Sequence, residues 1–424
     1  MTNLKNKHLL ILGGDALSAD IVNAARQMGV ITTVIDWHPV EISPAKLLAD
    51  NHYEISIKDY EAVNRLIADK KIDGVITGFT DSYLEPYAEI CSQNNWPCYA
   101  STFQFRITLD KDLFKKLCRE NNVPTVPQFS IDDIVENKRL PADKILIKPV
   151  DSSGSRGINL ISDFSEWEEA LRHSLSFSQK KEVLVEKYMD ADDVSICYTI
   201  RNGVISLSAV CDRFIHKTEK FGSVTSGLIY PSRFTHRYIK DVDENVKNMF
   251  ASLGLTNGVL FLQAFVDDES FYFYEMGYRL SGGRHYIFTQ EENNVSALNE
   301  LISFALTGEM SAEAAIHDNP LFSAYYCQLS VLCKSEKVAE IVGINELLHT
   351  PGVIDISTRI KEGDTVGQEG TTSQIVARLH LKADSIKAMD CLIEDVRSKL
   401  HIYSESGEDL IDDFFHIPMH LYEE

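Results

Sequence analysis

A lysine at the end of an apolar stretch, followed by a loop of small residues, is the part of this chain best suited to holding phosphate. Residues 144–150 read Lys-Ile-Leu-Ile-Lys-Pro-Val, and residues 151–157 continue as Asp-Ser-Ser-Gly-Ser-Arg-Gly. Backbone N–H groups of such a loop can surround phosphate oxygens, with Lys148 as a point charge beside them. The loop joins two strands and lacks G-x-x-x-x-G-K-[ST], so it is not the usual P-loop. We therefore predict a phosphate site, with a solvated hairpin turn as the alternative, formed by Lys148, Ser153, Gly154 and Ser155.

A second candidate site is a pair of oxygen-bearing side chains on a predicted hairpin. Residues 259–266 and 271–276 read as strands joined by Asp-Asp-Glu-Ser. A hairpin centred on Glu269 places Gln263 opposite Glu275, where cross-strand Cβ atoms lie about 5 Å apart. Mg²⁺ accepts few protein oxygens and keeps water and substrate phosphates as its other ligands. The pair therefore predicts a metal site, with a polar face on a surface hairpin as the alternative.

Four stretches, in order, resemble the nucleotide-binding motifs of the ATP-grasp superfamily, which includes biotin carboxylase and carbamoyl-phosphate synthetase. They are Leu-Asp-Lys-Asp-Leu-Phe-Lys at 109–115, Lys148 with its loop, Val-Glu-Lys-Tyr-Met at 185–189 with Asp-Asp-Val-Ser at 192–195, and Phe-Tyr-Phe-Tyr-Glu-Met-Gly-Tyr-Arg at 271–279. The last departs from the family's Glu-x-Asn-x-Arg, because Gly277 stands in place of Asn. The first metal ligand, often Glu, is here Gln263, as in the carbamoyl-phosphate synthetases. One ligand fewer argues against a tightly held second Mg²⁺.

The resemblance implies which residues meet the nucleotide. Beyond the phosphate loop they are those of the opening motif, the hinge and the lid: Lys111, Glu186, Lys187, Met189, Asp193 and Lys217. Residues 186–189 would meet the adenine edge, and Asp193 would meet the ribose hydroxyls. The cofactors implied are ATP, as a substrate, and Mg²⁺, with Mn²⁺ as a substitute.

The resemblance also implies a place for the reacting groups. Arg279 is the implied catalytic residue, because a guanidinium can hold two oxygens of a phosphate or of an activated acyl group. The substrate would lie against Gly282, Gly283 and Arg284. Asp81 follows a predicted strand and could face the acceptor substrate, although a helix N-cap is the favoured role for it.

Composition narrows the class of protein. The 424 residues are 44% hydrophobic and 25% charged, as in ordinary globular proteins. With 41 Lys and Arg against 63 Asp and Glu, the net charge is −22. A surface of this charge repels nucleic acids and anionic lipids, so we expect neither a nucleic-acid nor a membrane partner. The chain starts without a signal-like segment, and its eight cysteines form no CxxC pair, which together favour a cytoplasmic protein.

The first hundred residues alternate short apolar runs with helical patterns, which predicts a doubly wound parallel sheet. The predicted strands and helices are 9–12, 18–28, 31–35, 59–70, 75–78 and 83–94. A dinucleotide site is an alternative for this part, but residues 13–18 lack the third glycine of G-x-G-x-x-G.

The fold class predicted for the whole chain is α/β and α+β, in an ATP-grasp architecture. The predicted domains are a Rossmann-like 1–107, an ATP-grasp 108–318 with a lid at about 128–187, and a mostly antiparallel 319–424 that is similar to the C-terminal domain of biotin carboxylase.

The function that the resemblance implies is a carboxylate–amine ligase. ATP phosphorylates a carboxylate, and an amine displaces the phosphate to form an amide or peptide bond, as in L-amino-acid ligases. The expected partners are small acids and amines, with amino acids as the expected class, and a homodimer is allowed. A bicarbonate-activating carboxylase and a degenerate ATP-binding regulatory module are the alternatives; the absence of a Met-Lys-Met carrier triplet weighs against a biotin partner.

Overall fold

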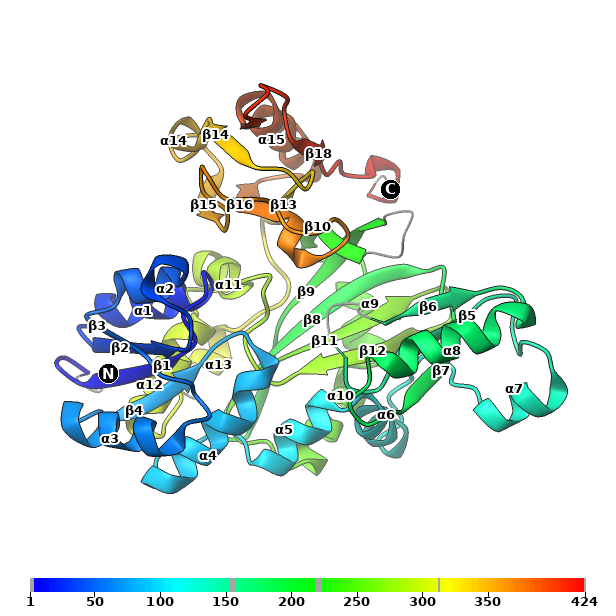
Figure 1. The fold of residues 1–424 in the computed structure, drawn as a ribbon, viewed down its shortest axis with the longest axis horizontal. Coiled ribbons are helices and arrows are strands. Elements are labelled where there is room, and N and C mark those ends of the chain that lie inside the picture. Colours follow the sequence, from blue (N-terminus) through cyan, green and yellow to red (C-terminus); the bar gives the residue numbers. More distant parts are fainter. Residues whose placement is uncertain (1–3, 153–156, 218–222, 312, 423–424) are drawn as a thin grey trace.

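The computed structural model describes residues 4–152, 157–217, 223–311 and 313–422. Figure 1 shows an N-terminal unit (blue) and a small lobe (residues 131–187) at opposite ends, with long strands of the central part between them. The C-terminal unit (orange to red) lies above these strands in the same view.

The N-terminal unit is built on a parallel sheet. Its strands are β1 (His8–Leu12), β2 (Ile31–Asp36), β3 (Asn51–Glu54) and β4 (Gly74–Thr77), in the order β3-β2-β1-β4. Every residue of β1 is buried, as expected for a strand covered on both faces. The accompanying helices are α1 (Ser18–Gln27), α2 (Pro44–Leu48), α3 (Tyr60–Lys70) and α4 (Leu84–Asn94). The predicted doubly wound parallel sheet is confirmed.

Three helices lead from this unit to a small antiparallel sheet. They are α5 (Thr102–Leu109), α6 (Lys111–Glu120) and α7 (Ile131–Asn137). Asp110 caps α6 by accepting from the backbone N–H groups of residues 112 and 113. The sheet has the order β6-β5-β7 and consists of β5 (Ile145–Pro149), β6 (Asn159–Ile161) and β7 (Val183–Lys187), packed against α8 (Trp167–Ser176). Its apolar side chains form a separate small core with Trp167.

A nine-stranded sheet forms the centre of the molecule. Its main path is β12-β11-β8-β9-β10-β13-β16-β15, and β18 also pairs with β13. The strands are β8 (Asp192–Arg201), β9 (Val204–Lys217), β10 (Ser223–Tyr230), β11 (Gly258–Val266), β12 (Phe271–Gly277), β13 (Tyr325–Cys333), β15 (Val353–Thr358), β16 (Ile375–Ala383) and β18 (Ile411–Asp413). Because β10 pairs with β13, the predicted boundary at 318 falls within one continuous sheet. The domain bounds stay a prediction.

The remaining elements cover this sheet or extend the C-terminal unit. The helices are α9 (Thr235–Asp241), α10 (Asp243–Ser252), α11 (Tyr286–Asn293), α12 (Ala297–Thr307), α13 (Ala314–His317), α14 (Ile344–Leu347) and α15 (Ile386–Lys399). A further antiparallel pair joins β14 (Val338–Val342) to β17 (His401–Ser404). The C-terminal unit has an apolar core of its own.

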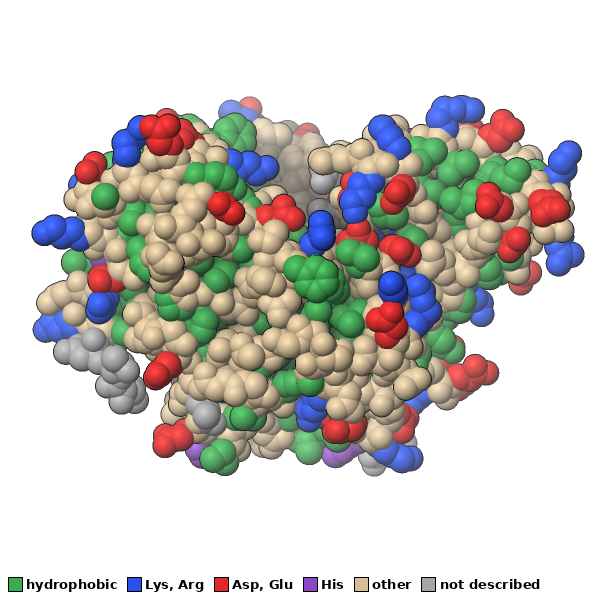
Figure 2. All heavy atoms as spheres, turned by 90° about the horizontal axis from the view of Figure 1, so that it is seen from below, with side chains coloured by type: hydrophobic (Ala, Val, Ile, Leu, Met, Phe, Trp, Pro, Cys, Tyr) green, Lys and Arg blue, Asp and Glu red, His purple; other side chains and the backbone are tan. Residues whose placement is uncertain are grey.

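The surface carries both signs of charge. Figure 2 shows acidic and basic side chains interspersed on the face seen from below, with hydrophobic side chains scattered between them. Isolated exposed hydrophobic residues are normal on a folded protein. No helix within the described ranges is both long and apolar enough to cross a membrane.

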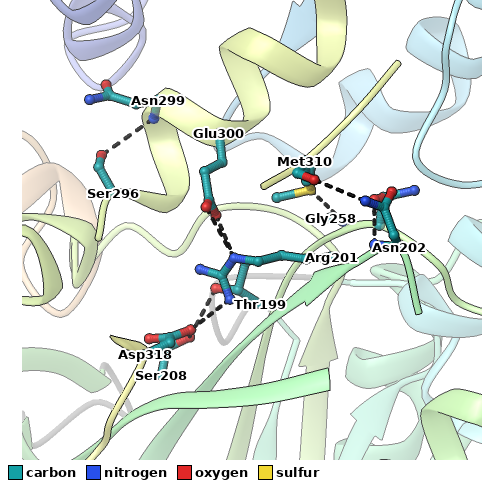
Figure 3. A network of polar contacts seen from close by, with 11 residues as sticks. Thr199, Arg201, Asn202, Ser208, Gly258, Ser296, Asn299, Glu300, Met310 and Asp318 are labelled. Atoms are coloured by element: carbon teal, nitrogen blue, oxygen red, sulfur yellow. Dashed lines mark hydrogen bonds and ion pairs between the residues drawn. The ribbon is translucent and has the colours of Figure 1, made fainter. Parts of the chain in front are cut away.

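Helix α12 joins the parallel sheet to the central sheet. On one side it approaches β4 so closely that a Cβ at Gly74 would lie 2.0 Å from the carbonyl oxygen of Ala305. On the other side Glu300 accepts from Nε of the fully buried Arg201, at 2.8 and 3.1 Å. Nη1 of Arg201 donates to Asp318 at 2.9 Å, and Ser208 donates to the same carboxylate (Figure 3). This network helps to fix the N-terminal unit relative to the central strands.

Glu300 makes this network sensitive to pH. Burial raises the pKa of Glu300 to about 7, against the opposing effect of Arg201. The pKa of Glu300 in the folded protein lies above its value in the unfolded chain, so proton binding by this carboxyl stabilises the fold. This contribution to the free energy of unfolding is complete below about pH 4.5 and is lost as the pH rises through about 7. We expect Glu300→Gln to remove this term, so that its stability relative to the wild type rises between pH 5 and 7 by at most about 1.4 kcal/mol per pH unit. Urea unfolding midpoints at several pH values measure it, and Glu61→Gln, on an exposed helix face, is the control. Parallel pH profiles for wild type and Glu300→Gln would contradict it.

Candidate functional site

Arg279 and Asp81 form a bidentate ion pair between the central sheet and the N-terminal unit. Arg279 follows β12, and Asp81 lies in a short 3-10 turn just after β4. Nε donates to Oδ1 at 2.5 Å and Nη2 donates to Oδ2 at 2.8 Å. Burial acts to lower the pKa of Arg279, but Asp81 outweighs it and holds the pKa above its ordinary value. Arg279 is therefore a fixed cation. The N-cap role predicted for Asp81 is wrong, since its carboxylate is bound by Arg279 instead of capping a helix.

Two cavities meet at Glu275. The larger, about 540 Å³, is lined by Asp81, Asp110, Lys111 and Ser152 from the N-terminal side and the small lobe. The smaller, about 210 Å³, lies over the central sheet. Its lining includes Gln263, Arg279, Ser281, Gly282, Gly283, Gln328, Ser330 and Arg378. Because Glu275 lines both cavities, the two cavities adjoin at this carboxylate.

The lysines of the predicted phosphate site lie close to this junction. Lys111 is the first residue of α6, and its Nζ donates to the carbonyl oxygen of Ser152 at 2.6 Å, so the helix is tied to the start of the 151–157 loop. Burial lowers the pKa of Lys111; the charge of Glu275 opposes this and that of Lys148 adds to it. The three groups are therefore near enough to influence one another electrostatically.

Lys148 is buried on β5 and shares one carboxylate with a second lysine. Its Nζ lies 2.6 Å from Oε2 of Glu186 on β7, and Lys115 of α6 donates to Oε1 of the same group. Burial acts to raise the pKa of Glu186, but Lys148 and Lys115 outweigh it and hold the pKa below its ordinary value. Burial lowers the pKa of Lys115 to about 8 despite Glu186. With both lysines protonated, these three side chains carry one net positive charge.

The predicted hinge connects the small lobe to the central sheet. Glu186 and Lys187 end β7, Met189 lies half-buried in the connection, and Asp193 is on β8. The side chain of Lys187 is exposed, and its N–H donates to the carbonyl of Pro127. Asp193 pairs with Arg213 at 2.8 Å and accepts from the Tyr274 hydroxyl at 3.1 Å. The Glu186 and Asp193 carboxylates thus have partners within the protein, so any contact with nucleotide from them competes with these bonds.

The predicted metal pair is in the expected register. Gln263 on β11 lies directly opposite Glu275 on β12, and both side chains line the smaller cavity. Among the described residues Glu275 has no hydrogen-bond or ion-pair partner, and no group of three His, Cys, Asp or Glu side chains could hold a metal ion. One carboxylate and one amide oxygen fit a Mg²⁺ that takes its other ligands from phosphate and water. The donor set therefore fits a metal–nucleotide complex better than a metal alone.

Gly277 has a structural reason that the sequence did not reveal. It lies opposite Phe261, and a Cβ at position 277 would lie 2.3 Å from that ring. The guanidinium of Arg279 sits over the same ring, 5.0 Å from its centroid. Phe261 therefore occupies the space of a side chain at 277 and packs against the guanidinium of Arg279.

The glycine-rich turn after Arg279 is only partly in contact with the cavities. Ser281, Gly282 and Gly283 line the smaller cavity, but Arg284 lines neither. Its buried guanidinium pairs with Asp20 of α1 and Asp355 of β15. Arg284 thus connects the N-terminal and C-terminal units, and its substrate role stays a prediction.

Ser153, Gly154 and Ser155 lie outside the described residues, and so does the side chain of Lys217 at the end of β9. Their assignment to ATP stays a prediction.

Several residues around the site were not identified from the sequence. They are Lys115, which pairs with Glu186, and four residues that line the smaller cavity: Phe261, Gln328, Ser330 and Arg378. A signal for the last existed, because residues 377–382 read Ala-Arg-Leu-His-Leu-Lys, an alternation that predicts a strand with one polar face.

Comparisons with known proteins show which proteins this chain is similar to. Residues 142–285 match the family model described as ATP-grasp domain. A formate-dependent phosphoribosylglycinamide formyltransferase from Sulfurisphaera tokodaii is 28% identical over 196 residues, which are 44% of this chain and 48% of that protein. The match thus spans about half of that relative's length.

Solved structures resemble the whole chain. The L-amino acid ligase from Bacillus licheniformis aligns with a TM-score of 0.78 at 16% identity, over 95% of this chain and 99% of that one. The biotin carboxylase domain of the 2-oxoglutarate carboxylase from Hydrogenobacter thermophilus, solved with MgADP and bicarbonate, aligns with a TM-score of 0.76 at 17% identity, over 95% and 91%. At such identities the likeness shows the fold, which is the predicted ATP-grasp architecture. Residues 142–285 thus match an ATP-grasp domain, and the chain as a whole is similar in fold to solved ligases and carboxylases.

Proposed function

We propose that this protein is an ATP-dependent carboxylate–amine ligase that forms an amide or peptide bond through an acyl phosphate and releases ADP and phosphate. The observation that carries the proposal is the position of Glu275, which lines a nucleotide-sized cavity beside Lys111 and a smaller cavity beside Arg279. A reaction that passes a phosphoryl group between two molecules needs adjoining binding sites for them. The name of the Bacillus licheniformis neighbour, an L-amino acid ligase, supports amino acids as the substrate class.

In this proposal the larger cavity takes ATP. Lys111 lines this cavity and would meet the phosphates together with Lys148. The contacts of residues 153–155 with phosphate, and of residues 186–189 and Asp193 with adenosine, are those that the motif resemblance implies. Gln263 and Glu275 are the residues that would hold Mg²⁺, which when bound neutralises phosphate charge. Phosphoryl transfer depends mainly on positioning and on electrostatic stabilisation, which the fixed lysines provide.

The smaller cavity takes the acid in this proposal. A carboxylate oxygen attacks the γ-phosphorus while the bond to the β,γ-bridging oxygen breaks and ADP leaves. The amine then attacks the acyl carbon, phosphate departs with the bonding electrons, and the amine loses a proton to solvent or phosphate. Arg279, held by Asp81, faces the charge that develops in both steps.

We expect release of ADP and phosphate that depends on both an acid and an amine. The assay incubates the protein with MgATP and pairs drawn from L-amino acids, formate and bicarbonate, and identifies nucleotide and product by chromatography and mass spectrometry. Formate is included because the Sulfurisphaera tokodaii relative is named as formate-dependent.

Each outcome decides a different point. AMP with pyrophosphate would place the attack at the α-phosphorus and exclude the acyl phosphate. ADP release with bicarbonate and no other acid would support the carboxylase alternative. ATP binding without turnover for any pair would support the degenerate regulatory module.

A further inference from the structure

The smaller cavity contains three arginines, and two of them have carboxylate partners. Arg213 pairs with Asp193, and Arg279 pairs with Asp81. Arg378, on β16 of the C-terminal unit, makes no hydrogen bond or ion pair with any described residue, although only 8% of its surface is exposed. A buried charge is costly without a counter-charge, so an unpartnered guanidinium that faces a cavity points to an anionic ligand.

The strands around Arg378 present a polar surface to the cavity. Arg378 lies opposite Ser330 of β13, and the next residue on the same face, His380, lies opposite Gln328. Nε2 of Gln328 donates to the Ser330 hydroxyl at 2.9 Å, and both residues are buried and line the cavity. The other faces of these strands, with Leu329 and Leu379, belong to the C-terminal core. Arg378 therefore stands in a built polar wall on a rigid sheet.

The surrounding charges leave Arg378 in need of an anion. Burial, and then the charges of Arg359 and Arg284, lower its pKa to about 9. Arg284 is balanced by Asp20 and Asp355, and Arg359 donates to the carbonyl oxygen of Thr372, so neither neighbour supplies negative charge. Glu275, on the same cavity, is in the proposed function committed to metal and phosphate.

We infer that Arg378 binds the carboxylate of the amine-bearing substrate, and that this substrate is therefore an amino acid. The inference rests on the proposed function. A guanidinium holds a carboxylate through two parallel N–H···O bonds. Arg279 lines the same cavity, so an amino acid anchored at Arg378 would share this cavity with the acyl group held near Arg279. The cavity volume of about 210 Å³ suits an amino acid better than a nucleotide.

Arg378→Met and Arg378→Lys test this inference, with Arg397→Met on the exposed face of α15 as the matched control. The acceptors are the L-amino acids, each beside its α-amide, which keeps the amine and lacks the carboxylate, and phosphoethanolamine as an amine with a phosphate. For Arg378→Met we expect kcat/KM to fall on the order of 10²-fold with amino acids and to change little with the amides. Arg378→Lys should recover only part of the loss, and Arg397→Met should behave like the wild type.

A binding measurement separates this inference from the proposed function. Thermal unfolding of the wild type should shift upward with an amino acid at millimolar concentration in the presence of MgADP, and that shift should vanish in Arg378→Met. Without ligand, Arg378→Met should unfold at the same or a higher temperature, because an apolar side chain replaces an unpaired buried charge.

Three results would overturn the inference. One is an equal loss of kcat/KM with amino acids and with their amides in Arg378→Met. Another is a preference for phosphoethanolamine that depends on Arg378. The third is a wild type that turns over acids and amines but whose unfolding temperature does not rise with any amino acid. A wild type that binds amino acids through Arg378 but releases no ADP would instead leave the inference standing and remove the proposed function.

Discussion

Replacing Arg279 with alanine is expected to slow turnover on the order of 10²–10³-fold while ATP affinity stays close to that of the wild type. The guanidinium lines the smaller cavity, which we propose takes the acid, and not the larger one, which we propose takes ATP. Charge builds on the transferring phosphoryl group and then on the tetrahedral centre, so a fixed cation helps more in the transition state than in the ground state. Steady-state kinetics give the turnover, and calorimetry gives the affinity for ATP.

Two further variants test why Arg279 is effective. Arg279→Lys should recover little, because an ammonium cannot reproduce the two-pronged pairing with Asp81 or stack over Phe261 in the same way. Asp81→Asn keeps Arg279 but weakens its anchor, so an intermediate loss is expected. The Asp81 side chain is 31% exposed, so water can solvate it when Arg279 is removed and the fold should survive. Near-normal turnover in both Arg279 variants would reduce this arginine to a structural ion pair.

Glu186→Gln is expected to lower the free energy of unfolding by about 3–5 kcal/mol, the usual cost of removing one member of a buried ion pair. The carboxylate is 3% exposed and serves two lysines, of which Lys115 is fully buried. Without the carboxylate, burial would lower the pKa of Lys115 below its present value of about 8, so this lysine would tend to lose its proton. Urea unfolding at pH 7 measures the change, with the exposed Glu182→Gln as the control.

Lys148→Met separates stability from nucleotide binding in the same triad. It leaves Lys115 and Glu186 as a balanced pair, so the loss of stability should be clearly smaller than in Glu186→Gln. ATP affinity, in contrast, should fall strongly, because the lysine beside the phosphate loop is gone. Unchanged ATP affinity in folded Lys148→Met would remove Lys148 from the nucleotide site, and equal stability of the two variants would show that the triad does not act as one unit.

Much of the fold could be predicted from local sequence patterns. The apolar run Leu9–Leu12 and the helical period that follows it predicted the parallel sheet, because such patterns depend only on neighbours in sequence. The opposition of Gln263 and Glu275 was also predictable, since a short connection sets the register of a hairpin. The motif resemblance added the ATP-grasp architecture on top of these patterns.

Contacts between residues far apart in the sequence could not be predicted from such local patterns. Asp81 and Arg279 are separated by 198 positions, and nothing near Asp81 distinguishes a helix cap from an ion-pair partner. Glu186 reads locally as a charged strand end, yet it is buried because α6 and β5 bring two lysines to it. Gly277 looked like a lost ligand, and only the packing of Phe261 explains why a side chain does not fit there.

The pairing of β10 with β13 has a consequence for how the chain can be divided. Tyr230, Ile229, Leu228 and Gly227 meet β13 residue by residue, so the C-terminal third supplies the backbone partners of a central strand. A fragment ending near residue 318 would leave the N–H and C=O groups of β10 as a free edge, and such edges recruit other strands. By pairing with β10, the C-terminal third therefore protects the central sheet from pairing with another copy of the chain. It also contributes residues that line the smaller cavity.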